Sequence, residues 1–84
     1  MRKREKLLER ILSGSDKNVR FGDMVSLMMA FGFRLARTSG SHHIFSREGM
    51  PELINLQNVH GQVKPYQIKQ FLALVERYNL QMEA

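Results

Sequence analysis

Three short segments in the middle of the chain alternate apolar and polar side chains, and the links between them limit the possible folds. The segments cover residues 33–37, 42–47 and 52–57, and only four residues separate each segment from the next. A parallel pair of strands needs a crossover of about a dozen residues or more, whereas an antiparallel pair needs only a short turn. The sequence therefore predicts a three-stranded antiparallel meander.

Helical patterns stand on both sides of these strands. Residues 2–12 and 21–31 repeat apolar side chains at the spacing of one helix face, and a third such pattern begins at Pro65, a residue that suits the first helical position. The predicted order is α-α-β-β-β-α, an α+β fold whose helices pack on one face of the sheet and leave the other open. The last two helices are expected to bury one apolar face each, with Leu74 and Tyr78 only at its margin. The residues expected in the core are Phe21, Met24, Val25, Met28, Met29, Ile68, Phe71, Leu72 and Val75.

The length of 84 residues predicts a single domain over residues 1–84. Residues 19–80 are expected to form its core, and residues 1–15 a basic helical extension. No stretch reaches the roughly 18 apolar residues of a membrane helix, and the amino terminus lacks a signal-peptide core, so we expect a cytoplasmic protein with no membrane partner. The chain has no cysteine, which excludes disulfides and thiolate metal ligands and fits a reducing compartment.

The balance of charge indicates a negatively charged partner. Lys and Arg number 13 against 8 Asp and Glu, which gives a formal net charge of +5. A basic domain attracts polyanions such as nucleic acids, although positive charge also serves solubility alone. The cations nearest in sequence to the predicted open sheet, and therefore the candidates for contacting RNA phosphates, are Arg34, Arg37, Arg47, Lys64 and Lys69.

Two adjacent histidines, His42 and His43, open the second predicted strand directly after Gly40 and Ser41. Neighbouring residues of a strand point to opposite faces, so only one of the two histidines can lie on the open face. Phe45 shares a face with His43 and has a large apolar area to bury, which places His42 outward and His43 inward or at the rim. A register slip of one residue would exchange them, so His43 is the alternate candidate.

An exposed histidine on a basic open sheet is suited to cleaving RNA without a metal ion. RNA carries its own nucleophile in the 2′-hydroxyl, and a histidine can remove that proton or protonate the leaving 5′-oxygen. Nearby Lys and Arg side chains would stabilise the charge that builds on the phosphate. The alternative is that both histidines are structural or solvated. No cofactor and no metal site are expected, because the adjacent histidines diverge and His60 lies beyond a strand and a turn.

Four segments stand out when the chain is taken as a whole. They are the helix end at residues 31–33, the turn and strand Gly40-Ser41-His42-His43-Ile44-Phe45, the third strand at residues 53–57 and the basic run at residues 64–72. With these segments in this order, over about residues 19–80, the sequence resembles the HicA family of small toxins from bacterial and archaeal toxin–antitoxin systems. The basic first helix is an addition to the family's pattern, and residues 58–62 replace the His-Pro-containing loop common in the family.

The resemblance implies a fold similar to double-stranded-RNA-binding domains, with helices on one side of a three-stranded sheet. It also implies a messenger-RNA interferase, an endoribonuclease that depends on a histidine at the start of the second strand, which is His42 in this chain. Gly40 and Ser41 would form the turn that presents this histidine. The implied partners are messenger RNA and a HicB-type antitoxin protein. Two alternatives remain, a non-catalytic RNA-binding module and a degenerate toxin that retains only antitoxin binding.

Overall fold

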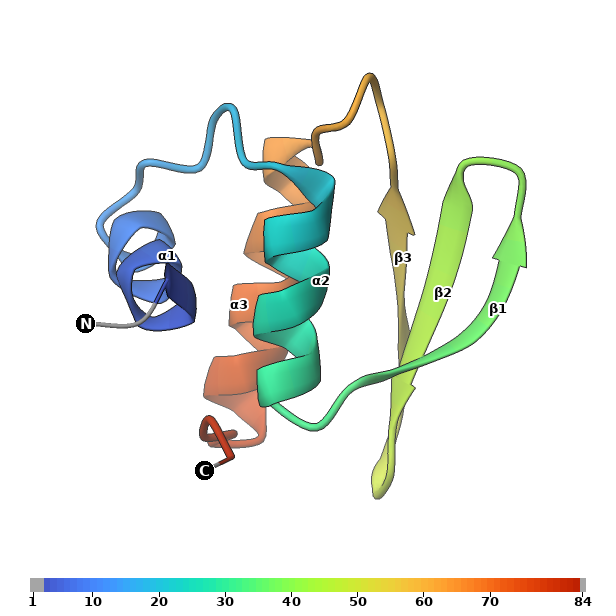
Figure 1. The fold of residues 1–84 in the computed structure, drawn as a ribbon. Coiled ribbons are helices and arrows are strands. Elements are labelled where there is room, and N and C mark those ends of the chain that lie inside the picture. Colours follow the sequence, from blue (N-terminus) through green and yellow to red (C-terminus); the bar gives the residue numbers. More distant parts are fainter. Residues whose placement is uncertain (1–2, 84) are drawn as a thin grey trace.

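The computed structural model describes residues 3–83, which form three helices and three strands (Figure 1). Three residues of the predicted domain lie outside the described residues. They are Met1 and Arg2, in the predicted basic extension, and Ala84, at the end of the predicted domain. The order of the elements confirms the predicted α-α-β-β-β-α arrangement. The elements are α1 (Lys3–Leu12), α2 (Phe21–Ala30), β1 (Arg34–Ser39), β2 (His42–Arg47), β3 (Met50–Gln57) and α3 (Pro65–Arg77).

The strands form one antiparallel sheet in the order β1-β2-β3, which confirms the predicted meander. Helices α2 and α3 both lie on one face of this sheet, with α2 in front of α3 in this view, and α1 lies beyond them, on the side away from the strands (Figure 1). An ion pair of 3.2 Å between Lys3 and Asp23 joins α1 to α2. The opposite face of the sheet carries no helix in the described part of the chain. None of the described helices is long and apolar enough to cross a bilayer.

The core fills the space between the helices and the covered face of the sheet, and it corrects two details of the predicted helix faces. Leu27, outside the predicted face, is buried, because α2 is packed against α1 on a second side. Met29, inside the predicted face, is 57% exposed and lines the pocket where β1 begins. Leu74 is only 5% exposed and belongs to the buried stripe of α3, whereas Leu72 and Val75 are partly buried beside it.

One buried polar side chain, Gln67, connects the end of β3 to the start of α3. Gln67 is only 1% exposed, and its Oε1 accepts hydrogen bonds from the backbone N–H of Gln57 at 3.2 Å and of Lys64 at 3.4 Å. One N–H group lies where β3 ends and the other where α3 begins, positions at which the backbone has no regular partner. The Gln67 side chain supplies the acceptor for both. This side chain therefore fixes the end of β3 at which the candidate site lies.

A second polar connection joins the other end of β3 to the end of α3. The Tyr78 hydroxyl donates to Glu52 Oε1 at 2.6 Å, and the Arg77 guanidinium donates to Glu52 Oε2 at 3.1 Å. The hydrogen bond from Tyr78 is the main cause that holds the pKa of Glu52 below its ordinary value, and the same bond raises the pKa of Tyr78. The two connections together hold α3 along the length of β3.

Candidate functional site on the open face of the sheet

A tight hairpin turn presents the first histidine of β2. Ser39 pairs with His42, so only Gly40 and Ser41 form the turn, and Gly40 has a positive φ of 61°. A two-residue hairpin with positive φ at its first turn residue is typical of a type II′ turn, which glycine adopts without strain. The Ser41 carbonyl accepts hydrogen bonds from the backbone N–H of Asn58 at 2.9 Å and from Nδ1 of His43 at 3.1 Å. The turn is therefore anchored from two sides.

The two histidines point to opposite faces, as strand alternation predicts. His42 is exposed on the open face, whereas His43 is half-buried on the covered face. The His43 ring packs against Phe21 at the start of α2, with ring centroids 4.6 Å apart. With one nitrogen bonded to the Ser41 carbonyl and its ring on a phenylalanine, His43 serves to support the turn. His42 is the histidine that is accessible to a ligand.

Two rows of side chains surround His42 on the open face. Residues directly opposite each other in neighbouring antiparallel strands share a face and lie about 4.5–5.5 Å apart. The pairing places Ser39 and Gln57 on either side of His42, and Ile44 with its neighbours Arg37 and Asn55 in the next row. These six residues are called the open-face site below, namely Ser39, His42, Gln57, Arg37, Ile44 and Asn55.

The ring of His42 is hydrogen-bonded to Asn55, its diagonal neighbour on β3. The distance from His42 Nδ1 to Asn55 Oδ1 is 3.2 Å. Because an amide oxygen can only accept a hydrogen bond, Nδ1 carries the proton in this arrangement. The neutral ring then has its lone pair on Nε2, the nitrogen that does not face Asn55. A lone pair on Nε2 is the state that a general base requires.

A β-bulge brings a cation onto the same face as His42. The register between β1 and β2 shifts between Leu35 and Arg37, so that Ala36 is an extra residue in β1. Strict alternation would put Arg34 and Arg37 on opposite faces, but the bulge places both on the open face, opposite Ser46 and Ile44. Arg37 is a diagonal neighbour of His42, with a Cα separation of about 7–8 Å. A guanidinium at this position can reach a phosphate that lies against His42.

The other cations predicted to contact RNA are distributed over the molecule. Arg34 is exposed on the open face near the far end of β1, and Lys64 is exposed at the start of α3, at the end of the sheet where His42 lies. Arg47 turns toward the helices, and its Nε donates to the Phe31 carbonyl at 2.7 Å. Lys69 is exposed on α3, which covers the opposite face of the sheet. Arg37 and Arg34 are thus the two members of the predicted set that share the face of His42.

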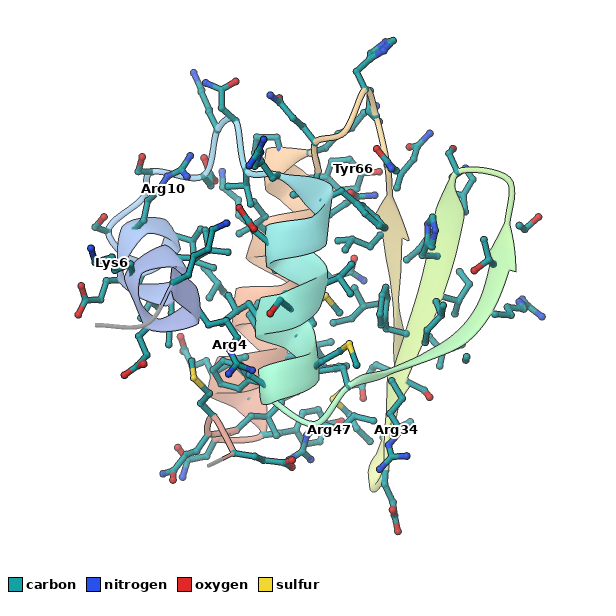
Figure 2. The ribbon with its side chains drawn as sticks, viewed as in Figure 1. Arg4, Lys6, Arg10, Arg34, Arg47 and Tyr66 are labelled. Atoms are coloured by element: carbon teal, nitrogen blue, oxygen red, sulfur yellow. The ribbon has the colours of Figure 1, made fainter. Side chains whose placement is uncertain are left out.

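Four further cations, Lys3, Arg4, Lys6 and Arg10, lie on α1 and are also remote from this site. Figure 2 shows Arg4, Lys6 and Arg10 on that helix, with α2 and α3 between them and the sheet. The basic first helix therefore contributes to the net charge of +5 but not to the immediate surroundings of His42. At physiological ionic strength the influence of an exposed charge decays over about 8 Å, so the charges of α1 have little effect on the potential at His42.

His60 occupies a turn rather than the open face. Its φ is 52°, in the left-handed region, and the turn is closed by a 2.8 Å hydrogen bond from the Gly61 N–H to Asn58 Oδ1. The side chain is exposed. Among residues 3–83, no three His, Asp or Glu side chains are grouped closely enough to hold a metal ion.

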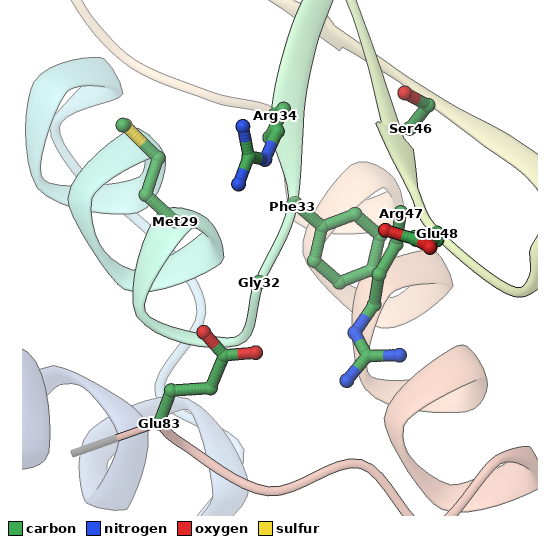
Figure 3. Close-up of a pocket in the computed structure, with 8 residues that line it drawn as sticks. All are labelled: Met29, Gly32, Phe33, Arg34, Ser46, Arg47, Glu48 and Glu83. Atoms are coloured by element: carbon green, nitrogen blue, oxygen red, sulfur yellow. The ribbon is translucent and has the colours of Figure 1, made fainter.

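A pocket of about 730 Å³ lies at the other end of the sheet, where β1 begins and β2 ends (Figure 3). Two arginines and two glutamates line it, together with apolar and small side chains, so it offers no surface of a single charge. His42 lies at the opposite end of β2 and does not line it. The lining residues are Met29, Gly32, Phe33, Arg34, Ser46, Arg47, Glu48 and Glu83.

The open-face site combines a proton-transfer group, a cation and neutral hydrogen-bonding groups. Sequence analysis found His42 and Arg37 but missed Ser39, Asn55 and Gln57. The two-residue turn at Gly40 and Ser41 was the available signal, because a hairpin of that length fixes Ser39 opposite His42. A site with these groups can bind a phosphodiester and transfer a proton at its 2′-oxygen or 5′-oxygen.

The chain matches a model of a known protein family. The model of the family described as "HicA toxin of bacterial toxin-antitoxin" matches residues 21–76, which include the whole sheet and all but the last residue of α3. Comparison with curated proteins and with solved structures gives no significant match. The expected likeness to double-stranded-RNA-binding domains therefore stays a prediction, whereas the α+β arrangement itself is observed.

Proposed function

The chain belongs to the HicA family, whose members are the toxins of bacterial toxin–antitoxin pairs, and from this premise we propose that it is a metal-independent endoribonuclease that cleaves messenger RNA. The observation that carries the proposal is the placement of His42. This histidine is exposed on the helix-free face of the sheet, at the end of an anchored turn, with its Nδ1 bonded and its Nε2 available.

The proposed reaction uses the 2′-hydroxyl of the RNA as the nucleophile. Nε2 of His42 takes the 2′-hydroxyl proton while the 2′-oxygen forms a bond to the adjacent phosphorus. The bond from phosphorus to the 5′-oxygen breaks, and that oxygen takes a proton from solvent. Arg37 stabilises the extra negative charge on the phosphate, and the neutral side chains of Ser39 and Gln57 can donate hydrogen bonds to its oxygens. The products are a cyclic 2′,3′-phosphate and a free 5′-hydroxyl.

The proposed partners are messenger RNA in the cytoplasm and a HicB-type antitoxin protein. Membership of a toxin family implies an antitoxin that restrains the activity. An antitoxin that covers the open-face site would exclude RNA from His42 directly, because a single shallow face holds the whole candidate site.

Incubation of the purified protein with a messenger RNA in the presence of EDTA tests this proposal. We expect endonucleolytic cleavage that is unaffected by the chelator and that yields cyclic 2′,3′-phosphate ends. Loss of activity in EDTA would contradict the metal-independent mechanism. An RNA that stays intact during prolonged incubation with the folded protein, while still binding to it, would instead support the non-catalytic RNA-binding alternative.

Replacement of Arg37 by alanine is expected to lower the affinity for RNA and to make that affinity less dependent on salt concentration. A side chain that contacts one phosphate releases about one counterion, so the slope of log affinity against log salt concentration should fall by about 0.7 for a single strand. The affinity should be measured by titrating a single-stranded RNA oligonucleotide at several salt concentrations. The protein should carry His42→Ala, so that the RNA stays intact during the titration.

Lys69→Ala is the matched control for Arg37→Ala. It removes the same unit of charge from α3, on the covered side of the sheet. We expect its salt slope to equal that of the parent protein within error. Equal losses of affinity in the two variants would show that net charge, rather than the position of Arg37, governs binding.

A further inference from the structure

We infer that Asn55 is a positioning residue, which holds the His42 ring in the tautomer that has its proton on Nδ1 and its lone pair on Nε2. The inference rests on the proposed function, because it assigns Asn55 a part in the same reaction. The bond that carries it is the 3.2 Å contact between His42 Nδ1 and Asn55 Oδ1.

The register of the sheet explains why Asn55 is the residue that reaches His42. Gln57 lies directly opposite His42 on β3, and Asn55 lies opposite Ile44 in the adjacent row. A diagonal neighbour of this kind is about 7–8 Å away between Cα atoms, within reach of an imidazole and a short amide side chain. The His42 ring therefore points diagonally from β2 toward Asn55 on β3, away from the hairpin turn.

The backbone beneath this pair is firmly held, which favours a defined geometry over a transient contact. On the covered face Ile54 and Leu56, the chain neighbours of Asn55, are fully buried. Beyond them, the Gln57 N–H is bonded to the buried side chain of Gln67. On β2, the turn before His42 is fixed through the Ser41 carbonyl. Both partners thus stand on strands whose opposite face is packed.

The chemical consequence follows from which atom of Asn55 faces the ring. A neutral imidazole can carry its proton on either nitrogen, and a solvated histidine has no fixed partner to select one. An acceptor at Nδ1 selects the tautomer whose Nε2 can take a proton from RNA. Without Asn55, the ring would rotate freely and would populate both tautomers, so that only part of the protein would be ready to react.

Histidine labelled with ¹⁵N at the ring nitrogens allows the tautomer of His42 to be measured by NMR, independently of activity. The signals of His42 are assigned by their loss in His42→Ala. We expect the neutral ring to carry its proton on Nδ1 in the wild type and in Leu53→Ala, an exposed control position two residues before Asn55 on β3. In Asn55→Leu, which has a similar volume and no acceptor, we expect a mixture of both tautomers.

Cleavage kinetics of the same variants test whether the hydrogen bond between His42 and Asn55 contributes to the reaction. For Asn55→Leu we expect kcat to fall by about 10- to 100-fold with KM for RNA little changed, a smaller loss than the roughly 10²–10⁴-fold contribution of a general base. Asn55→Asp keeps an acceptor at Nδ1, so its kcat at saturating RNA should return to within about threefold of the wild type.

Two results would overturn the inference. One is an unchanged Nδ1–H tautomer in folded Asn55→Leu, and the other is an unchanged kcat in that variant of an active protein. A wild type that does not cleave RNA would instead contradict the proposed function. In that case the NMR comparison still decides whether Asn55 holds the ring.

Discussion

His42→Ala is expected to reduce RNA cleavage by about 10²–10⁴-fold, the range that a positioned general acid or base contributes. The side chain is exposed, and its hydrogen bond in the described structure is the one to Asn55 on the protein surface. Its removal should therefore change the free energy of unfolding by no more than about 0.5 kcal/mol. The rate is measured on a defined RNA in EDTA at saturating protein, and stability by urea unfolding followed by circular dichroism.

His43→Ala is the matched control and should show the opposite pattern. It removes the ring contact with Phe21 and the hydrogen bond to the Ser41 carbonyl, so it should lower the free energy of unfolding by about 1 kcal/mol. At temperatures at which this variant is folded, we expect it to cleave RNA at a rate within about tenfold of the wild-type rate. Full activity in His42→Ala together with its loss in a folded His43→Ala would transfer the catalytic role to His43.

The assignment of the two histidines to opposite faces followed from the sequence because it needs only local physics. The short links fixed an antiparallel meander, and strand alternation separated His42 from His43. The burial of Phe45 then decided which histidine faces the helices. Each of these steps depends on neighbours in the chain, and the structure agrees with each of them.

The composition of the site around His42 could not be predicted in the same way. The bulge at Ala36 turns Arg37 onto the open face, and a single alanine in an alternating strand gives no sign that it is an extra residue. The hydrogen bond from His42 Nδ1 to Asn55 Oδ1 depends on the register between β2 and β3, which sets the partner of every residue in the two strands at once. Gln67 at the third helical position can accept from the Lys64 N–H, which is a local contact, but its hydrogen bond from the Gln57 N–H is a tertiary contact that the helix's own sequence does not show.

The predicted face of α3 was wrong at its margin for a related reason. Leu74 was expected at the edge, whereas it is buried in line with Ile68 and Phe71. The apolar side chains of this helix spread over more of its surface than the sheet can cover. They are Ile68, Phe71, Leu72, Leu74 and Val75. The position of β3 and the neighbouring helix decides which part of a wide apolar face is buried, and neither is visible in the helix's own sequence.

Phe71→Ala is expected to have the largest effect on stability, a loss of about 3–5 kcal/mol in the free energy of unfolding. Phe71 is 0% exposed. Its ring centroid is 5.4 Å from that of Phe31 and 5.8 Å from that of Phe33, both in edge-on arrangements. Truncation removes these contacts and leaves a cavity between α3 and the segment that joins α2 to β1. At about 0.05–0.15 kcal/mol per residue, a chain of 84 residues has only about 4–13 kcal/mol in total, so the variant should be largely unfolded or close to it.

Tyr66→Ala provides the matched comparison, because it also removes an aromatic ring from α3. Tyr66 is 60% exposed near the start of the helix, so we expect its loss to cost less than about 1 kcal/mol. Phe71→Leu keeps most of the buried volume and should fall between the two. Urea unfolding of the three variants ranks these effects directly. Equal unfolding midpoints for Phe71→Ala and Tyr66→Ala would contradict a core centred on the three phenylalanines, because burial would then not separate the two positions.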